Sequence, residues 1–263
     1  MIDLHTHILP AIDDGSRDID ESMGLIAEEG RQGVSTIVAT PHFYAQEMSV
    51  KGFLERREEA FRRVMERLGG EEPSGRAPAS LQTQADPNRA PSSLQTKGHP
   101  RILKGAEVYF FPGMGAAEAL PSLTMEGTNV LLLEMPFAQW TGTIYEEVRR
   151  IIKEQHLTIL LAHLERFYQF QKDRSVLEKV LALPGVQVQV NTGALADWKR
   201  RRIIKKILQG NNPVVLGSDC HNMRSRQPNL AAGREIIEKK LGGQAMLDQL
   251  DANAQRLLGK AQN

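Results

Sequence analysis

Two histidines and two aspartates stand close together at the start of the chain, in the segment MIDLHTHILPAIDDG. Successive side chains of a β-strand point to opposite faces, so His5 and His7 would lie side by side on one face. A turn through Asp13 and Asp14 would bring a carboxylate back toward the same edge. Two imidazoles beside a carboxylate form a donor set for a divalent metal ion. A solvated pair of histidines is the alternative that this segment alone leaves open.

Imidazole and carboxylate groups also follow most of the other apolar segments. VSTIVAT leads into His42, VLLLE ends on Glu134, and PVVLGS leads into Asp219. Nine such groups stand at or just beyond predicted strand ends: His5, His7, Asp14, His42, Glu107, Glu134, His163, Asp219 and His221. In a parallel α/β barrel the carboxyl ends of the strands form one rim, where active sites are built. Nine ionisable groups there would desolvate and repel one another unless cations compensated them. The sequence therefore predicts a multinuclear metal site.

The types of these groups and two nearby arginines favour phosphate chemistry. Imidazole and carboxylate donors without thiolate suit Mn, Fe or Zn, and a carboxylate-rich set leans toward Mn. Two metal ions about 3.5 to 4 Å apart can activate water and clamp the oxygens of a phosphoryl group. Arg166 and Arg226 follow His163 and His221 closely and are placed to hold phosphate oxygens, with surface ion pairs as the alternative role. We expect metal-assisted hydrolysis of a phosphate ester.

The composition is that of one soluble globular domain, which we assign to residues 1–263. The chain has 263 residues, 41% of them hydrophobic and 25% charged, and a formal net charge of +1. That balance gives no reason to expect nucleic acid as a partner. The single cysteine, Cys220, excludes an intramolecular disulfide and suits a reducing compartment. We see no apolar segment of membrane-spanning length and no signal peptide, so we expect a cytoplasmic protein without membrane insertion.

The elements that must position these groups alternate along the chain. Short apolar segments predict seven strands, at Ile2 to His7, Val34 to Ala39, Ile102 to Val108, Val130 to Met135, Thr158 to Ala162, Val186 to Val190 and Val214 to Gly217. Helical spacing predicts helices at Asp20 to Gln32, Phe53 to Leu68, Thr143 to His156, Arg174 to Leu183, Asp197 to Gln209 and Asn229 to Lys240. This alternation indicates a parallel sheet, and seven units favour a closed or nearly closed barrel.

Residues 69–99 interrupt the alternation with a segment of low complexity. The segment is rich in Pro, Ser, Gln, Ala and Gly, and it nearly repeats itself as APASLQT and APSSLQT. Such a composition buries too little apolar surface to offset the entropy of ordering it. We expect a disordered insertion before the third strand, either without a role or used to bind a partner.

Six motifs in order resemble a known family. HTHILPAIDDG, VATPH, GAEVYF, LLLEMPF, LAHLER and GSDCHN resemble the motifs of the polymerase-and-histidinol-phosphatase (PHP) superfamily. They look most like its bacterial tyrosine-protein phosphatases from capsular and exopolysaccharide operons. The resemblance covers nearly the whole chain except the insertion. It implies a distorted (β/α)₇ barrel with three metal ions, usually manganese.

The resemblance also implies ligands and a reaction. One ion would be held by His5, His7, Glu107 and Asp219, a second by Glu107, Glu134 and His163, and the third by Asp14, His42 and His221. Arg166 and Arg226 correspond to arginines that contact phosphate in that family. The implied reaction is hydrolysis of phosphotyrosine without a covalent phosphoenzyme. The implied partner is the autophosphorylated tyrosine tail of a kinase that controls polysaccharide export.

Three other functions stay open at this point. Cys220 and Arg226 have the C-x5-R spacing of cysteine-dependent tyrosine phosphatases, although no glycine lies between them to form a phosphate-cradling loop. A PHP phosphoesterase acting on a small molecule such as histidinol phosphate would have the same fold and metals. A binding module that uses the metals structurally would bind a kinase without catalysis. The basic segment from Lys199 to Lys206 is either a docking site for an acidic tail or a solvated helix face.

Overall fold

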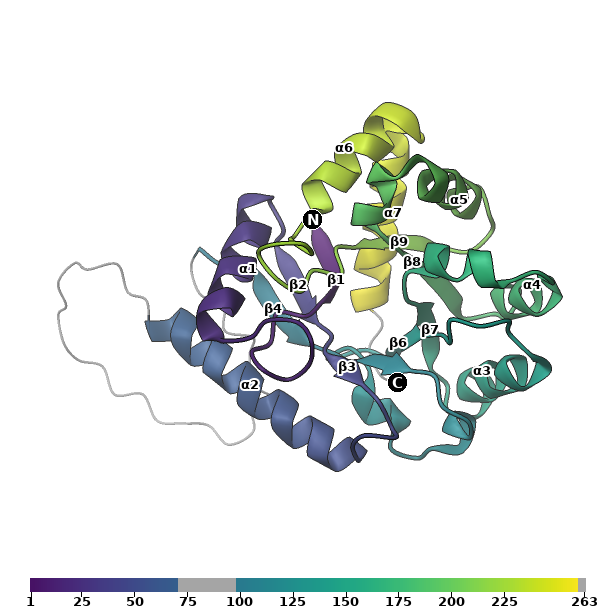
Figure 1. The fold of residues 1–263 in the computed structure, drawn as a ribbon, viewed down its shortest axis with the longest axis horizontal. Coiled ribbons are helices and arrows are strands. Elements are labelled where there is room, and N and C mark those ends of the chain that lie inside the picture. Colours follow the sequence, from purple (N-terminus) through teal and green to yellow (C-terminus); the bar gives the residue numbers. More distant parts are fainter. Residues whose placement is uncertain (71–97, 260–263) are drawn as a thin grey trace.

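The strands form a ring with helices on its outer side (Figure 1). The computed structural model describes residues 1–70 and 98–259. Every strand pairing among these residues is parallel. The strands are β1 (Ile2–Thr6), β2 (Thr36–Ala39), β3 (His42–Phe43), β4 (Arg101–Lys104), β5 (Glu107–Tyr109), β6 (Val130–Glu134), β7 (Thr158–Leu161), β8 (Val186–Asn191) and β9 (Val214–Gly217).

Helices fill most of the connections between the strands. They are α1 (Ile19–Arg31), α2 (Val50–Gly70), α3 (Gly142–Glu154), α4 (Ser175–Leu181), α5 (Trp198–Leu208), α6 (Leu230–Lys240) and α7 (Gly243–Leu258). Between β5 and β6 the described chain forms only the 3₁₀ turns η1 (Met114–Ala116) and η2 (Leu120–Leu123), and the turn η3 (Leu164–Arg166) follows β7.

One predicted strand is interrupted in the middle, and another is followed directly by a second, short strand. β2 leads through Thr40 and Pro41 into β3, and β4 leads through Gly105 into β5, so a three-stranded sheet β1-β2-β4 joins a six-stranded sheet β3-β5-β6-β7-β8-β9. Gly105 permits this close approach, because a Cβ there would lie 3.1 Å from the side chains of Thr40 and Val38. The prediction of one strand from Ile102 to Val108 was therefore wrong in its continuity. If β2 with β3, and β4 with β5, are each counted as one strand, all seven predicted strands are present in the predicted order.

The ring closes between the first and last strands. Thr6 and Cys220 form a parallel bridge. His7 N donates to Cys220 O at 2.9 Å, and Asp219 N donates to His5 O at 2.9 Å. The expectation of an α/β barrel is confirmed. Closure also brings the residues that follow β1 directly against those that follow β9.

Two apolar clusters stabilise this arrangement. The larger lies between the strands and the helices. The smaller takes side chains from six strands, including Leu4, Val38 and Leu160, and adds Ala254 and Leu257 of α7. α7, which the sequence analysis did not predict, contacts both β1 and β9 and so covers the closure of the ring. Burial of apolar surface at about 25 cal/mol per Å² is the main favourable term in holding these layers together.

Helix starts carry local signals in two places. Asp18 accepts a hydrogen bond from Glu21 N at 2.9 Å at the start of α1, and Asp197 accepts one from Arg200 N at 2.8 Å at the start of α5. Each carboxylate satisfies a backbone N–H that has no partner within the helix. The predicted insertion at 69–99 starts inside α2, since Gly69 and Gly70 are helical. Its central residues 71–97 lie outside the described part of the chain.

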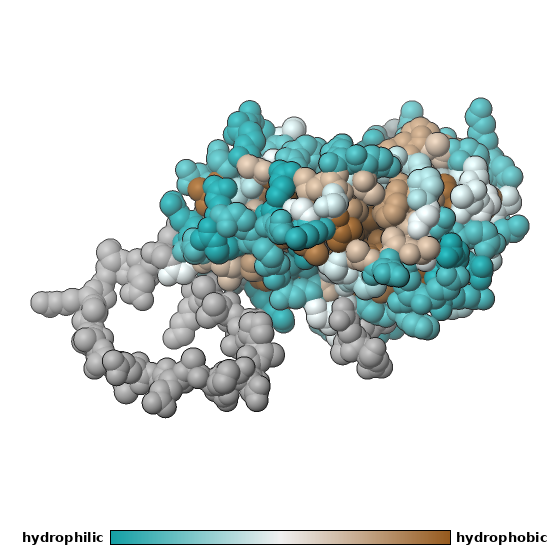
Figure 2. Space-filling view, turned by 90° about the horizontal axis from the view of Figure 1, so that it is seen from below, coloured by the Kyte–Doolittle hydropathy of each residue, from teal (hydrophilic) through white to brown (hydrophobic). Residues whose placement is uncertain are grey.

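The face seen in Figure 2 is mostly hydrophilic, with a band of hydrophobic residues across its centre. Within the described ranges, no helix combines the length and the apolar composition that crossing a bilayer requires. In the described part of the chain two large apolar side chains are exposed, Phe137 at 45% and Trp198 at 55%. Trp198 is the first residue of α5.

Candidate metal centre

All nine predicted side chains meet at the carboxyl end of the barrel. Donor atoms within 4.8 Å of one another define three groups in the described chain. The groups are His7, Asp14, His42 and His221; His5, His7 and Asp219; and His42, Glu107 and Glu134. The residues come from six different strands or the segments directly after them, so only the closed ring brings them together.

The three groups follow the expected ligand sets with three differences. The group of His5, His7 and Asp219 lacks Glu107, which the resemblance implied for it. The group around Asp14 gains His7. The group around Glu107 and Glu134 contains His42 where the resemblance implied His163. His163 is nevertheless adjacent, because its Nε2 lies 2.9 Å from Glu107 Oε1 and 3.4 Å from Glu134 Oε1.

Glu107 Oε2 is the most crowded donor atom of the centre. It lies 3.0 Å from His5 Nε2, 3.2 Å from His7 Nε2 and 3.1 Å from His42 Nδ1. Although buried, Glu107 Oε2 and His42 Nδ1 take part in no hydrogen bond of acceptable geometry, and neither does His221 Nε2. Buried polar atoms normally have a hydrogen-bond partner. These three atoms have lone pairs but no hydrogen-bond partner, and they lie within one cluster. They are therefore suited to coordinate divalent cations.

Charge in the centre is balanced by protonation of two imidazoles. Burial opposes the charged form of His7, but the Asp13 and Glu107 carboxylates outweigh it and raise the pKa of His7 to about 10. Burial also opposes the charged form of His163, but Glu107 and Glu134 raise its pKa to about 9. Burial lowers the pKa of both His42 and His221. A divalent cation would replace the two protons, because metal ligands must be deprotonated.

Three carboxylates of the centre, those of Glu107, Asp219 and Asp14, are held in their charged form. Burial would raise the pKa of Glu107, but His5 and the neighbouring imidazoles bring it well below the ordinary value. Burial is likewise outweighed at Asp219, whose pKa is lowered by His5 and Arg166. The pKa of Asp14 is lowered by His221, whose Nε2 lies 3.3 Å from Asp14 Oδ1. Ionised carboxylates at neutral pH are ready to bind cations.

A second layer of polar groups fixes the orientation of the donors. Asp13 Oδ2 lies 2.7 Å from His7 Nδ1 and accepts the backbone N–H of His42 at 2.9 Å. On β8, Gln189 Oε1 lies 3.2 Å from His5 Nδ1, and Asn191 donates to Asp219 Oδ2 at 2.7 Å. Outer partners of this kind fix the imidazole tautomer and ring direction. The sequence analysis missed Gln189 and Asn191, although alternating polar residues in the buried strand VQVQVN were the available signal.

The backbone at two of the donors is strained. Asp219 has φ 53° and His163 has φ 30°, the left-handed region that residues with a Cβ seldom adopt. Such residues persist where the surrounding structure fixes them, and they cluster at functional sites. The strained backbone at Asp219 and His163 therefore agrees with a functional requirement for the orientation of these two side chains.

Arg166 and Arg226 both contact Asp219. Arg166 Nη2 hydrogen-bonds to Asp219 Oδ2, and Arg226 Nη2 donates to Asp219 Oδ1 at 2.7 Å. Together with Asn191 and Asn229 they line a polar cavity of about 230 Å³. The two guanidinium groups therefore lie at the edge of the donor cluster, where an anion bound to it would reach them.

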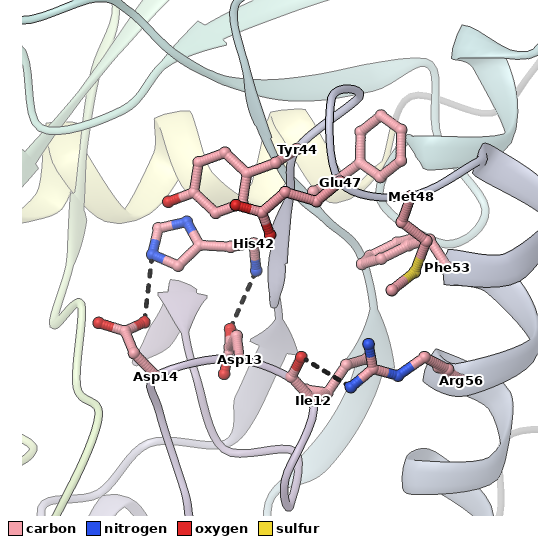
Figure 3. Close-up of a pocket in the computed structure, with 10 residues that line it drawn as sticks. Ile12, Asp13, Asp14, His42, Tyr44, Glu47, Met48, Phe53 and Arg56 are labelled. Atoms are coloured by element: carbon pink, nitrogen blue, oxygen red, sulfur yellow. Dashed lines mark hydrogen bonds and ion pairs between the residues drawn. The ribbon is translucent and has the colours of Figure 1, made fainter.

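A second cavity opens beside the cluster (Figure 3). Its volume is about 330 Å³, and its lining includes Asp14 and His42 of the cluster. The remaining walls are mainly apolar or aromatic, from Ile12, Phe43, Tyr44, Met48 and Phe53, with Arg56 and Glu47 beside them. The Tyr44 ring lies 5.3 Å from that of His42. This volume falls in the range of small-ligand pockets, about 300 to 1,000 Å³.

Cys220 does not face either cavity as a nucleophile would. Its side chain is fully buried, and burial raises the pKa of the thiol well above its ordinary value. A cysteine nucleophile needs a lowered pKa and partial exposure. The cysteine-dependent mechanism suggested by the C-x5-R spacing is therefore wrong for this structure.

The barrel is closed and parallel, and imidazoles, carboxylates and arginines stand at the carboxyl ends of its strands. This arrangement places the protein among the α/β-barrel proteins with a metal-binding rim. The family model described as "Capsular polysaccharide synthesis, CpsB/CapC" matches residues 1–76 and 86–259. The chain belongs to this family, and the resemblance inferred from the six motifs is confirmed at that level.

Full-length relatives agree. The chain is 26% identical over 267 aligned positions to the tyrosine-protein phosphatase CpsB of Streptococcus agalactiae serotype III, with 98% of each chain covered. It is 25% identical to the tyrosine-protein phosphatase YwqE of Bacillus subtilis, covering 98% of this chain and 91% of the relative.

Solved structures agree in fold. A crystal structure reported for YwqE from Bacillus subtilis and CpsB from Streptococcus pneumoniae, described as metal-dependent tyrosine phosphatases, matches with a TM-score of 0.73 at 22% identity. That match covers 100% of this chain and 96% of the other. The phosphotriesterase homology protein of Escherichia coli matches with a TM-score of 0.51 at 13% identity, with 98% of each chain covered. At these identities the likeness concerns the fold alone.

Proposed function

We propose that this protein is a metal-dependent phosphatase that hydrolyses phosphotyrosine in a protein substrate. The observation that carries the proposal is the position of the donor cluster between two cavities of different chemistry. Asp219 joins the cluster to the arginine cavity, and Asp14 and His42 join it to the aromatic cavity. A phosphate at the cluster would meet the guanidinium groups, and its aryl ester group would meet the aromatic and apolar side chains of the second cavity.

The eight side chains of the three donor groups, with His163 beside them, would hold three ions, one at each group. Mn²⁺ suits this mixture of imidazole and carboxylate, and Fe or Zn are the alternatives. When bound, the ions would supply activation of water and polarisation of the phosphate. Asp13, Gln189 and Asn191 would hold the donors in the required orientation.

The remaining roles fall to the arginines and the aromatic cavity. Arg166 and Arg226 would pair with the non-bridging phosphate oxygens, for which the planar guanidinium offers two parallel donors. Tyr44 and Phe53 would pack against the tyrosine ring and exclude water from it. The leaving phenol, with a pKa of about 10, departs more readily than an alkoxide and needs little help from a general acid.

The physiological setting follows from the family. Its description refers to capsular polysaccharide synthesis, and its relatives are named tyrosine-protein phosphatases. We extend both to this chain and propose the phosphorylated tyrosines of a cognate bacterial kinase as its substrate. The cytoplasmic location expected from the sequence stays a prediction.

A comparison of substrates tests the function. Wild-type protein with Mn²⁺ should hydrolyse a phosphotyrosine peptide with a higher kcat/KM than histidinol phosphate, since the cavity beside the cluster suits an aromatic ring. Tyr44→Ala should lower kcat/KM for the peptide by about 2- to 10-fold, the value of an aromatic contact. Tyr44→Phe keeps the ring and should retain activity.

Each alternative gives a different result. Faster turnover of histidinol phosphate would indicate a phosphoesterase for small molecules. Absence of hydrolysis of any aryl phosphate, with metal bound, would indicate a binding module.

A further inference from the structure

The helix α5 has an unusual distribution of charge. Six of the chain's 33 Lys and Arg residues lie in the eleven residues WKRRRIIKKIL, which contain no Asp or Glu. Ile204, Ile207 and Leu208 bury the inner face of the helix. Within residues 1–70 and 98–259, no carboxylate lies within 4.0 Å of any of these six basic groups. α5 therefore carries an excess of positive charge, with the Asp197 carboxylate at its start as a nearby acidic group that interacts with Arg200 and Lys199.

The exposed residues of α5 form a continuous stripe. Lys199, Arg202 and Lys206 stand at positions i, i+3 and i+7, which places them on one side of the helix. With Trp198 and Ile203 they line a shallow hollow of about 350 Å³. Trp198 is 55% exposed, and Lys199 Nζ lies 5.8 Å from the centre of its ring. We call Trp198, Lys199, Arg202 and Lys206 the α5 basic face.

The first turn of α5, which contains Trp198 and Lys199 of the α5 basic face, lies beside the arginine cavity. Arg200, in the same turn of the helix, lines the 230 Å³ cavity together with Arg166, Arg226 and Asp219. α5 also packs against the turn η3, which carries Arg166. From Lys199 to Lys206 the helix rises about 10 Å, the length of about three extended residues. A polypeptide whose phosphotyrosine occupies the centre could thus cross the α5 basic face with its neighbouring residues.

We propose that the α5 basic face binds acidic residues that lie beside the phosphotyrosine in the substrate polypeptide. This inference rests on the proposed function and adds a sequence preference to it. Charge complementarity selects Asp and Glu side chains, and the Trp198 ring offers an apolar contact to the chain between them. An anionic membrane surface has the same charge, but Arg200, in the same turn as Lys199, lines a concave cavity that a flat bilayer would not fill.

The test compares three substrates at low and high salt. They are a phosphotyrosine peptide with Asp and Glu beside the phosphotyrosine, the same peptide with Asn and Gln instead, and p-nitrophenyl phosphate. The variant Lys199→Gln/Arg202→Gln/Lys206→Gln removes the charge of the face and keeps long side chains. The matched control, Arg31→Gln/Lys153→Gln/Lys240→Gln, removes the same charge from exposed positions on α1, α3 and α6.

The wild type should prefer the acidic peptide by about 3- to 30-fold in kcat/KM, the range that three exposed ion pairs support. The preference should shrink as salt screens these charges. The α5 variant should lose the preference for the acidic peptide because its KM for that peptide rises. Its turnover of p-nitrophenyl phosphate should be unchanged. The control variant should keep the preference.

The outcomes separate the two proposals. Equal use of the two peptides by the wild type, or an unchanged preference in the α5 variant, overturns the inference. Loss of binding to phosphatidylglycerol vesicles in that variant, without loss of peptide preference, shows a membrane surface instead. If the wild type hydrolyses no aryl phosphate, the proposed function fails. Binding of a fluorescent acidic peptide, measured by anisotropy, then tests this inference separately. Weaker binding to the α5 variant than to the wild type would support it, and equal binding would overturn it.

Discussion

His7 Nδ1 lies 2.7 Å from Asp13 Oδ2, and His7 Nε2 faces Glu107 and Asp219 on the opposite side of the same ring. The carboxylate of Asp13 is ionised, because His7 lowers its pKa despite burial. An ionised carboxylate only accepts hydrogen bonds, so Nδ1 carries the proton. Deprotonation of His7 then leaves Nε2 free to coordinate a metal ion.

Asp13→Asn should weaken metal binding while leaving the fold intact. The amide cannot stabilise the required tautomer as the carboxylate does, and loss of such an outer partner typically costs 10- to 100-fold in metal affinity. Titration calorimetry with Mn²⁺ measures the change. Asp248→Asn, on the exposed face of α7, is the control and should bind as the wild type does. Equal affinities of the Asp13 variant and the wild type would refute this role.

The metal-free protein should lose stability as the pH rises above neutral. The pKa values of His7 and His163, about 10 and about 9, exceed the ordinary value for histidine of about 6.5. The two protons therefore stabilise the fold fully below about pH 6.5, and this contribution disappears as the pH passes 9 to 10.

Thermal unfolding of chelated protein between pH 6.5 and 9.5 measures this effect. With saturating Mn²⁺ the decline should be reduced or reversed, because metal binding displaces the protons and strengthens with pH. If the stability of the chelated protein stayed constant or rose over this pH range, the result would contradict protonation of His7 and His163 in the folded state.

Replacing either arginine should impair catalysis without removing metal. Arg166→Ala and Arg226→Ala should each lower kcat on p-nitrophenyl phosphate by about 10²- to 10³-fold, the effect of losing one preorganised donor to transition-state charge. Metal content should stay at the wild-type level, since neither side chain belongs to a donor group. Activity within twofold of wild type would show that these arginines serve only to pair with Asp219.

Cys220 and His42 should differ sharply in importance. Cys220→Ala should retain activity, because the buried thiol reaches neither cavity. His42→Ala removes a side chain shared by two donor groups and should abolish measurable turnover. Steady-state assays of both variants at equal metal loading make the comparison. A loss in the Cys220 variant as large as that in the His42 variant would revive the thiol mechanism.

The sequence predicted the barrel and the convergence of nine donors because both depend on local patterns. A residue after an apolar strand lies at the rim whatever the details of packing, so His42, Glu134 and Asp219 were found by position alone. The helix α7 was equally predictable from Leu247, Leu250 and Leu257 at helical spacing, but that signal was overlooked.

Other features depend on contacts between distant segments. The interruption at Gly105 follows from its approach to Val38 and Thr40, which no local pattern reveals. Sharing of His7 and His42 between donor groups depends on ring closure. The aromatic cavity joins Ile12 after β1 to Phe53 on α2, and only the folded chain brings them together.

The central claim is that the clustered donors hold divalent ions that the reaction requires. The most direct measurement is metal analysis of the purified protein combined with p-nitrophenyl phosphate hydrolysis before chelation, after chelation and after return of Mn²⁺. We predict bound divalent metal in the active protein, loss of activity on its removal and recovery with Mn²⁺. Full activity in protein shown to be free of metal would contradict the account.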